Sequence, residues 1–130
     1  MDFNHVTTEE AVATYNATHN IFTGLIREVR ELSRKKPDAT LSQGKVKMIN
    51  RVLADLRNVL EKEPEYKFLD LLDDEELPQT SDAVLVMVQF ESALESFSKH
   101  YHRRAKKGYD TRYVWVTNQL TLEKNEVFDE

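Results

Sequence analysis

The chain has 130 residues, of which 40% are hydrophobic and 32% charged, and its formal net charge is −5. This length suits one compact domain, and the hydrophobic content is higher than that of a disordered chain. The absence of cysteine excludes disulfides, thiolate metal sites and a cysteine nucleophile. Three glycines and three prolines are too few for the turns of a many-stranded barrel or sandwich. We therefore expect one mainly helical domain over residues 1–130.

The sequence shows no sign of export or membrane insertion. The first ten residues lack the basic start and apolar stretch of a secretory signal. The longest apolar run, Ala83 to Val88, is far shorter than the roughly 18 residues needed to span a bilayer. We expect a cytoplasmic protein with no membrane contact.

Residues 7–36 are predicted to form the first long helix. The residues from Thr7 to Glu10 read Thr-Thr-Glu-Glu, a capping box that satisfies free backbone donors at a helix start. Apolar or small residues then recur at alternating spacings of four and three, which places them on one side of a helix: Ala11, Tyr15, Thr18, Phe22, Leu25, Val29 and Leu32. Pro37 ends the segment.

Three more helical segments are expected before residue 107. Residues 41–62 follow a second capping box at Thr40 and end before Pro64. Residues 65–72 are predicted as a short helix, followed by an acidic loop at 73–76. Residues 81–106 form the third long helix, and Gly108 has the place of the glycine that commonly follows a helix.

The residue composition changes after Gly108. Residues 111–122 are rich in β-branched and aromatic side chains, which favours an extended strand or a small hairpin. An isolated hairpin is marginal in water, so this one must pack on the bundle or pair with another chain. Residues 124–130 are acidic and are expected to be a mobile tail. The predicted fold is thus mainly α: a bundle of three long helices plus one short helix, with a C-terminal strand or hairpin.

Templates for catalytic and cofactor sites find no match. His100 and His102 are two residues apart and would point in different directions on a helix. The glycines are scattered, so neither a phosphate-binding loop nor a dinucleotide fingerprint exists. We predict no catalytic, cofactor or metal residues. An enzyme that binds a divalent metal through the acidic loop remains an alternative, and its candidate carboxylates are Asp70, Asp73, Asp74, Glu75 and Glu76.

The segment from Lys99 to Arg112 carries six basic residues and one aspartate, which makes it locally strongly positive. Basic side chains interleaved with tyrosines can hold phosphates or an acidic partner while a ring stacks on a base. The candidate contacts are Arg103, Arg104, Lys106, Lys107, Tyr109 and Arg112. The plain alternative is that these charges only complement the dipole at the end of the third helix. That alternative is favoured because the whole chain is acidic.

A second candidate surface combines aromatic and acidic residues. Aromatic side chains anchor protein interfaces, and acidic and basic patches can pair between molecules. The candidate interface residues are Tyr113, Trp115, Asp73, Asp74, Glu75 and Glu76. The favoured function is therefore a non-catalytic cytoplasmic protein-interaction or regulatory module. It would bind a protein partner or associate with itself as an oligomer such as a homodimer, through complementary charged surfaces. A helical nucleic-acid-binding subunit is the first alternative, and the metal-dependent enzyme is the second.

Overall fold

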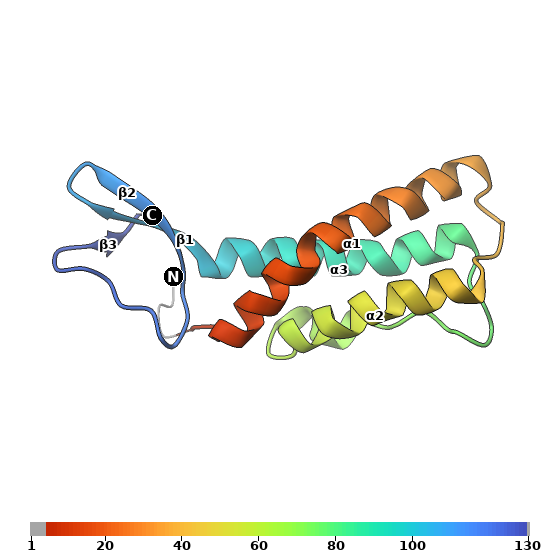
Figure 1. Cartoon of the computed structure of the whole chain (residues 1–130), viewed down its shortest axis with the longest axis horizontal. Coiled ribbons are helices and arrows are strands. Elements are labelled where there is room, and N and C mark those ends of the chain that lie inside the picture. Colours follow the sequence, from red (N-terminus) through yellow and green to blue (C-terminus); the bar gives the residue numbers. More distant parts are fainter. Residues whose placement is uncertain (1–4, 130) are drawn as a thin grey trace.

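The computed structural model describes residues 5–129. In this range an elongated bundle of helices carries a small sheet at one end (Figure 1). The long helices are α1 (Glu9–Lys35), α2 (Gln43–Val59) and α3 (Thr80–Tyr101). The sheet comprises β1 (His102–Lys107), β2 (Asp110–Trp115) and β3 (Val127–Phe128). The mainly helical class predicted from the sequence is confirmed.

Helix α1 begins close to the predicted capping box. Thr8 is its N-cap, and the Thr8 hydroxyl accepts a hydrogen bond of 3.0 Å from the backbone N–H of Ala11. Arg34 and Lys35 lie in the last turn, where positive charge complements the helix dipole. One face of the helix is buried, at Val12, Tyr15, Thr18, Phe22, Ile26 and Val29.

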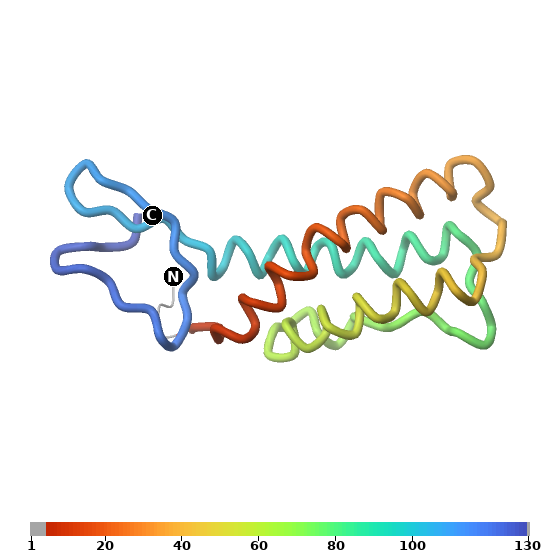
Figure 2. The backbone as a smooth tube through the Cα atoms, in the orientation of Figure 1, coloured from red at the N-terminus to blue at the C-terminus, as the bar shows by residue number. Residues whose placement is uncertain are grey.

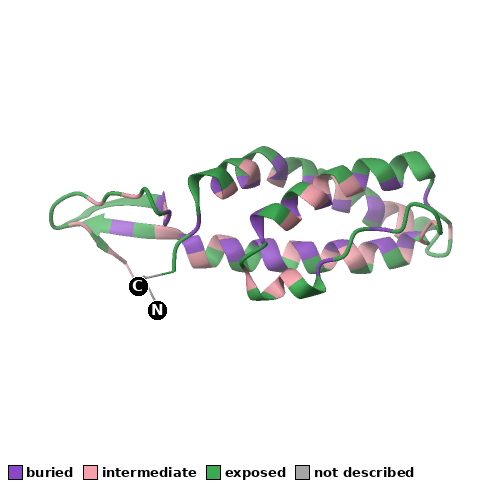
Figure 3. Cartoon of the chain, turned by 90° about the horizontal axis from the view of Figure 1, so that it is seen from below, coloured by how far each residue is buried: buried purple, intermediate pink, exposed green. Residues whose placement is uncertain are grey.

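The core lies between the three helices, and in Figure 3 the buried residues line the sides of the helices that face one another. Its largest fully buried side chains include Phe90 and Phe97 of α3 with Leu53 and Leu56 of α2. The sheet is mostly exposed by comparison. Among the described residues, no helix is both long enough and apolar enough to cross a bilayer.

The connection from α2 to α3 differs from the predicted short helix. Only Pro64–Phe68 is helical, and it is a 3₁₀ turn, η1, rather than a helix over 65–72. The chain then returns to the end of the bundle that lies away from the sheet (Figure 2). Asn50 of α2 holds this return, because its side chain donates to the Leu72 carbonyl at 2.8 Å and accepts from the Leu72 N–H at 2.9 Å. These tertiary hydrogen bonds replace the ones that a longer helix would have made.

Helix α3 ends at Tyr101, five residues before the predicted end. Residues 102–107 are instead strand β1, paired antiparallel with β2 from His102↔Trp115 to Lys107↔Asp110. Gly108 has φ 62°, and with Tyr109 it forms a two-residue hairpin turn. A glycine at the first central position fits the type II′ turn, which matches strand twist. The prediction of a basic helix end closed by Gly108 is therefore wrong.

The C-terminal residues also depart from the prediction. Of the expected extended segment 111–122, only the part up to Trp115 is in a strand. The expected mobile tail instead returns to the hairpin, where β3 pairs with β1 at Ala105↔Phe128 and Lys106↔Val127. Residue 130 lies outside the described range. The hairpin is also tied to the start of α1, since the Thr7 N–H donates to the Val116 carbonyl at 3.0 Å.

Candidate docking surface on the C-terminal sheet

The sheet has strand order β2-β1-β3, and its two faces have different environments. Cross-strand partners share a face, and successive residues alternate between faces. One face, which we call the open face, carries three cross-strand pairs: His102 with Trp115, Arg104 with Tyr113, and Lys106 with Thr111. The covered face carries the other three pairs: Arg103 with Val114, Ala105 with Arg112, and Lys107 with Asp110.

Aromatic side chains connect the open face to the bundle. The His102 ring stacks on Trp115 with centroids 4.5 Å apart and lies 5.5 Å from the Tyr113 ring. Trp115 in turn packs against Tyr15 of α1 and Phe97 of α3, at 5.2 and 5.8 Å between centroids. Trp115 therefore anchors the sheet to the core, whereas Tyr113 is 68% exposed. Of the two aromatic residues predicted for an interface, only Tyr113 is largely exposed.

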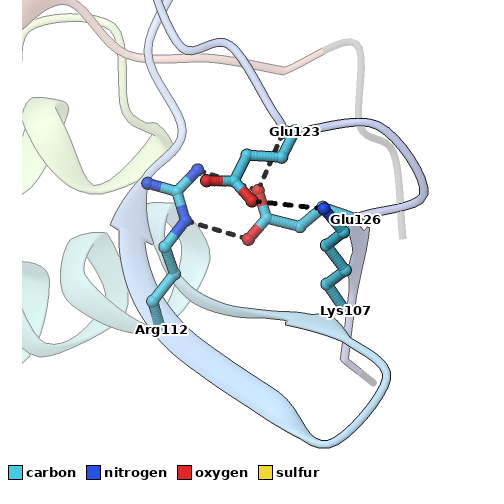
Figure 4. Close-up of polar contacts among 4 residues, drawn as sticks. All are labelled: Lys107, Arg112, Glu123 and Glu126. Atoms are coloured by element: carbon cyan, nitrogen blue, oxygen red, sulfur yellow. Dashed lines mark hydrogen bonds and ion pairs between the residues drawn. The ribbon is translucent and has the colours of Figure 1, made fainter.

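On the covered face, acidic residues of the C-terminal segment, residues 119–129, contact basic residues of the hairpin (Figure 4). The Arg112 guanidinium donates two hydrogen bonds to the Glu126 carboxylate, at 2.9 and 2.8 Å. Lys107 forms an ion pair of 3.7 Å with Glu123. The Glu126 side chain is only 4% exposed. Hydrogen bonds from Arg112, and then from the backbone N–H of Glu123, lower the pKa of Glu126 to about 2.

The remaining basic candidates also contact the C-terminal segment. Arg104 and Lys106 both form ion pairs with Asp129, and the Lys106–Asp129 distance is 3.7 Å. The Arg103 guanidinium lies 5.8 Å from the centroid of the Phe128 ring. Tyr109 is fully exposed at the tip of the hairpin. The structure thus gathers the basic candidates on two adjacent strands, where they contact the C-terminal segment rather than an open helix end.

The acidic loop does not join this surface. It lies at the end of the bundle opposite the sheet, so the predicted acidic and basic surfaces are far apart within one molecule (Figure 1). Asp73 closes a turn there, because its carboxylate accepts hydrogen bonds of 2.9 Å from the N–H groups of Glu75 and Glu76. These bonds lower the pKa of Asp73. Within residues 5–129, no group of three or more histidine, aspartate or glutamate side chains is arranged to hold a metal ion.

A cleft of 580 Å³ lies where the start of α1 meets the end of α2. Its charged lining is mostly acidic: Glu10, Asp55, Glu61, Lys62 and Glu63. At its edge the Tyr101 hydroxyl donates to the Glu63 carboxylate at 3.1 Å. Burial raises the pKa of Glu63, and burial together with this carboxylate raises the pKa of Tyr101 well above its usual range. This pair joins the end of α3 to the chain after α2, which is a structural role.

Sequence reasoning missed the acidic partners of the hairpin. Glu123, Glu126 and Asp129 are spaced three residues apart, and together they contact Lys107, Arg112, Arg104 and Lys106. The available signal was a run of acids at regular spacing that follows a basic segment of opposite charge. Comparison of the chain with protein-family models, with curated proteins and with solved structures finds no match.

Proposed function

We propose that the chain is a non-catalytic, cytoplasmic protein-interaction module that self-associates through its C-terminal sheet. The observation that carries the proposal is that β2 forms one edge of the sheet. A strand at a sheet edge presents backbone donors and acceptors that can pair with another strand. Strand addition at such an edge is a recurring mode of protein recognition.

The hairpin turn defines which groups of β2 point outward. In a two-residue hairpin the closing residues, here Lys107 and Asp110, exchange both backbone hydrogen bonds. Every second residue of β2 therefore faces β1, and Thr111 and Tyr113 direct their N–H and C=O groups away from it. Both side chains are also exposed on the open face. An incoming strand would meet free backbone groups and the Tyr113 ring together.

The position of the hairpin suits pairing between two copies. It extends beyond the end of the bundle, so β2 lies away from the helices (Figure 1). Antiparallel pairing of β2 with its copy about a two-fold axis would give a closed dimer with one continuous sheet. Tyr109 and Tyr113 would add rigid amphipathic surface beside the seam, as tyrosines commonly do at interfaces.

The alternative functions have less support. A nucleic acid would compete with Glu123, Glu126 and Asp129 for the same basic side chains. A metal-dependent enzyme would require ligands from several elements, whereas the loop carboxylate of Asp73 accepts hydrogen bonds from its own backbone.

The test is the solution mass by light scattering behind size exclusion. We expect the natural chain to elute at twice its 15.2 kDa mass. Thr111→Pro removes the outward N–H and leaves the β1–β2 hydrogen bonds in place, so this variant should be monomeric with unchanged helical circular dichroism. Thr111→Ala keeps the N–H and should remain dimeric.

Two outcomes would contradict the proposal. A natural chain that is monomeric at the highest attainable concentration would exclude self-association. A dimer that dissociates in high salt would indicate ion pairs instead of strand pairing, because surface ion pairs are screened by salt.

A further inference from the structure

We propose that the basic hairpin is a docking site for an acidic, extended segment of a partner protein. In the free molecule, residues 119–129 of the chain itself, which we call the C-terminal strap, occupy this site. The site comprises the edge of β1 opposite β2, the covered face of the hairpin, and the open-face residues Arg104 and Lys106 beside that edge. It differs from the β2 edge, so the two surfaces can act independently.

Each of the three acids Glu123, Glu126 and Asp129 of the strap contacts at least one basic side chain of the hairpin. The Glu126 carboxylate accepts two hydrogen bonds from Arg112, and Glu123 forms an ion pair of 3.7 Å with Lys107. Asp129 lies between Arg104 and Lys106 on the open face. Three acids at a spacing of three residues therefore engage four basic side chains. Complementary charges of this kind select a partner and fix its register.

The strap is bound in the way that an extended peptide adds to a sheet edge. Its backbone runs antiparallel to β1, and the Asp129 N–H donates to the Arg104 carbonyl at 2.8 Å. Phe128 pairs with Ala105, which is fully buried. The surface therefore favours an acidic segment that carries an apolar residue directly before its last acid.

The backbone of the strap pairs with only a short part of β1. It pairs with only two of the six residues of β1, so a longer extended segment could pair with more of that edge. Both members of the Lys107–Glu123 pair are exposed, at 49% and 65%, and exposed ion pairs contribute little to stability. Val127 is 54% exposed. Such a segment opens locally, while the six-residue pairing of β1 with β2 keeps the site formed.

The experiment uses a fluorescent peptide with the sequence of residues 119–130 and the full chain carrying Glu126→Lys and Asp129→Lys. We expect the peptide to bind this variant by fluorescence anisotropy, and to bind more weakly as salt increases. Binding to the unmodified chain should be at least about 10-fold weaker, because the tethered strap competes at high effective concentration. A peptide with glutamine and asparagine in place of its acids should not bind.

A matched control separates the site from overall charge. The variant with Glu75→Lys and Glu76→Lys has the same net charge change on the acidic loop, at the opposite end of the molecule. It should bind the acidic peptide no better than the unmodified chain. Equal binding by both charge-reversed variants, or no binding by either, would overturn the proposal. Tighter binding of a single-stranded oligonucleotide of equal charge would also overturn it, and would reassign the site to nucleic acid.

A second measurement does not depend on the folding of the variant. In the unmodified chain, hydrogen exchange at the Asp129 amide should be at least about 10-fold faster than at the inward amides of β2, because local opening releases the strap first. Equal protection of these amides would show that the strap opens only with the sheet, and would overturn the proposal.

Discussion

Glu126 shows how strongly a single contact sets the chemistry of this surface. Its carboxylate accepts two hydrogen bonds from Arg112 and one of 3.0 Å from the Glu123 N–H. All three favour the charged form, so the pKa falls from its ordinary 4.5 to about 2. A group with a lowered folded pKa stabilises the folded chain above its unfolded pKa. That contribution is lost as the pH falls through the folded value.

We predict that the hold on the C-terminal strap is complete above about pH 5 and weakens as the pH falls toward about 2. Titration of the Glu126 carboxyl carbon by NMR should give a midpoint near pH 2. In Arg112→Gln the midpoint should return toward the ordinary 4.5. Lys99→Gln is a suitable control, because Lys99 pairs with Glu95 on α3 and should leave the midpoint unchanged. An ordinary midpoint in the natural chain would contradict the paired geometry.

At the scale of single residues, the sequence predicts local contacts and misses distant ones. The Thr-x-x-Glu capping box predicted Thr7 as the N-cap of α1, and the structure places the cap one residue later, at Thr8. The partners of Arg112 and Lys107 lie 14 and 16 residues further along the chain. Local patterns do not include contacts at that separation, so the basic side chains were predicted without their partners.

At the scale of elements, the helices were predictable and the hairpin was misplaced. A stripe of apolar residues indicated each long helix. A helix that buries one face has apolar residues at every third or fourth position, which the sequence shows directly. The basic run before Gly108 is rich in arginine, lysine and alanine, whose local preferences favour a helix over a strand. Glycine can follow a helix or open a type II′ turn, since both require positive φ. Only the pairing of residues 102–107 with β2 decides between them.

A glycine substitution in the hairpin turn and one in α1 should change the stability of the chain in opposite directions. Gly108 has φ 62°, so Gly108→Ala should destabilise the chain by about 1 kcal/mol through backbone strain. Gly24 lies within α1 with open space around it, so Gly24→Ala should stabilise the chain by about 1 kcal/mol. Urea denaturation followed by circular dichroism measures both. A stabilising Gly108→Ala would argue against the turn.

At the scale of the whole molecule, stability comes from the bundle. Phe90 of α3 is fully buried, and Phe90→Ala should cost about 3–5 kcal/mol by loss of apolar contacts and creation of a cavity. Leu85→Ala on the same helix is the control, because Leu85 is 64% exposed and its loss should change stability by less than about 0.5 kcal/mol. Thermal unfolding of both variants makes the comparison. Similar melting temperatures would contradict the arrangement of the core.

The molecule separates its charges along its length. The acidic loop and the C-terminal sheet lie at opposite ends of the bundle, so they cannot neutralise each other within one chain (Figure 1). The hairpin charges are balanced by the strap instead. The interaction surfaces that we propose therefore lie at the sheet end, and the bundle supports them through Trp115.

The sequence by itself determined the mainly helical class and placed the start of α1 within two residues, because these features depend on periodicity and capping within a short stretch of chain. The tertiary structure decided where α3 ends, which strands pair and which carboxylates meet the basic hairpin. These features depend on contacts between residues far apart in sequence. A strand is stable only when its backbone groups find a partner, and local sequence does not specify that partner.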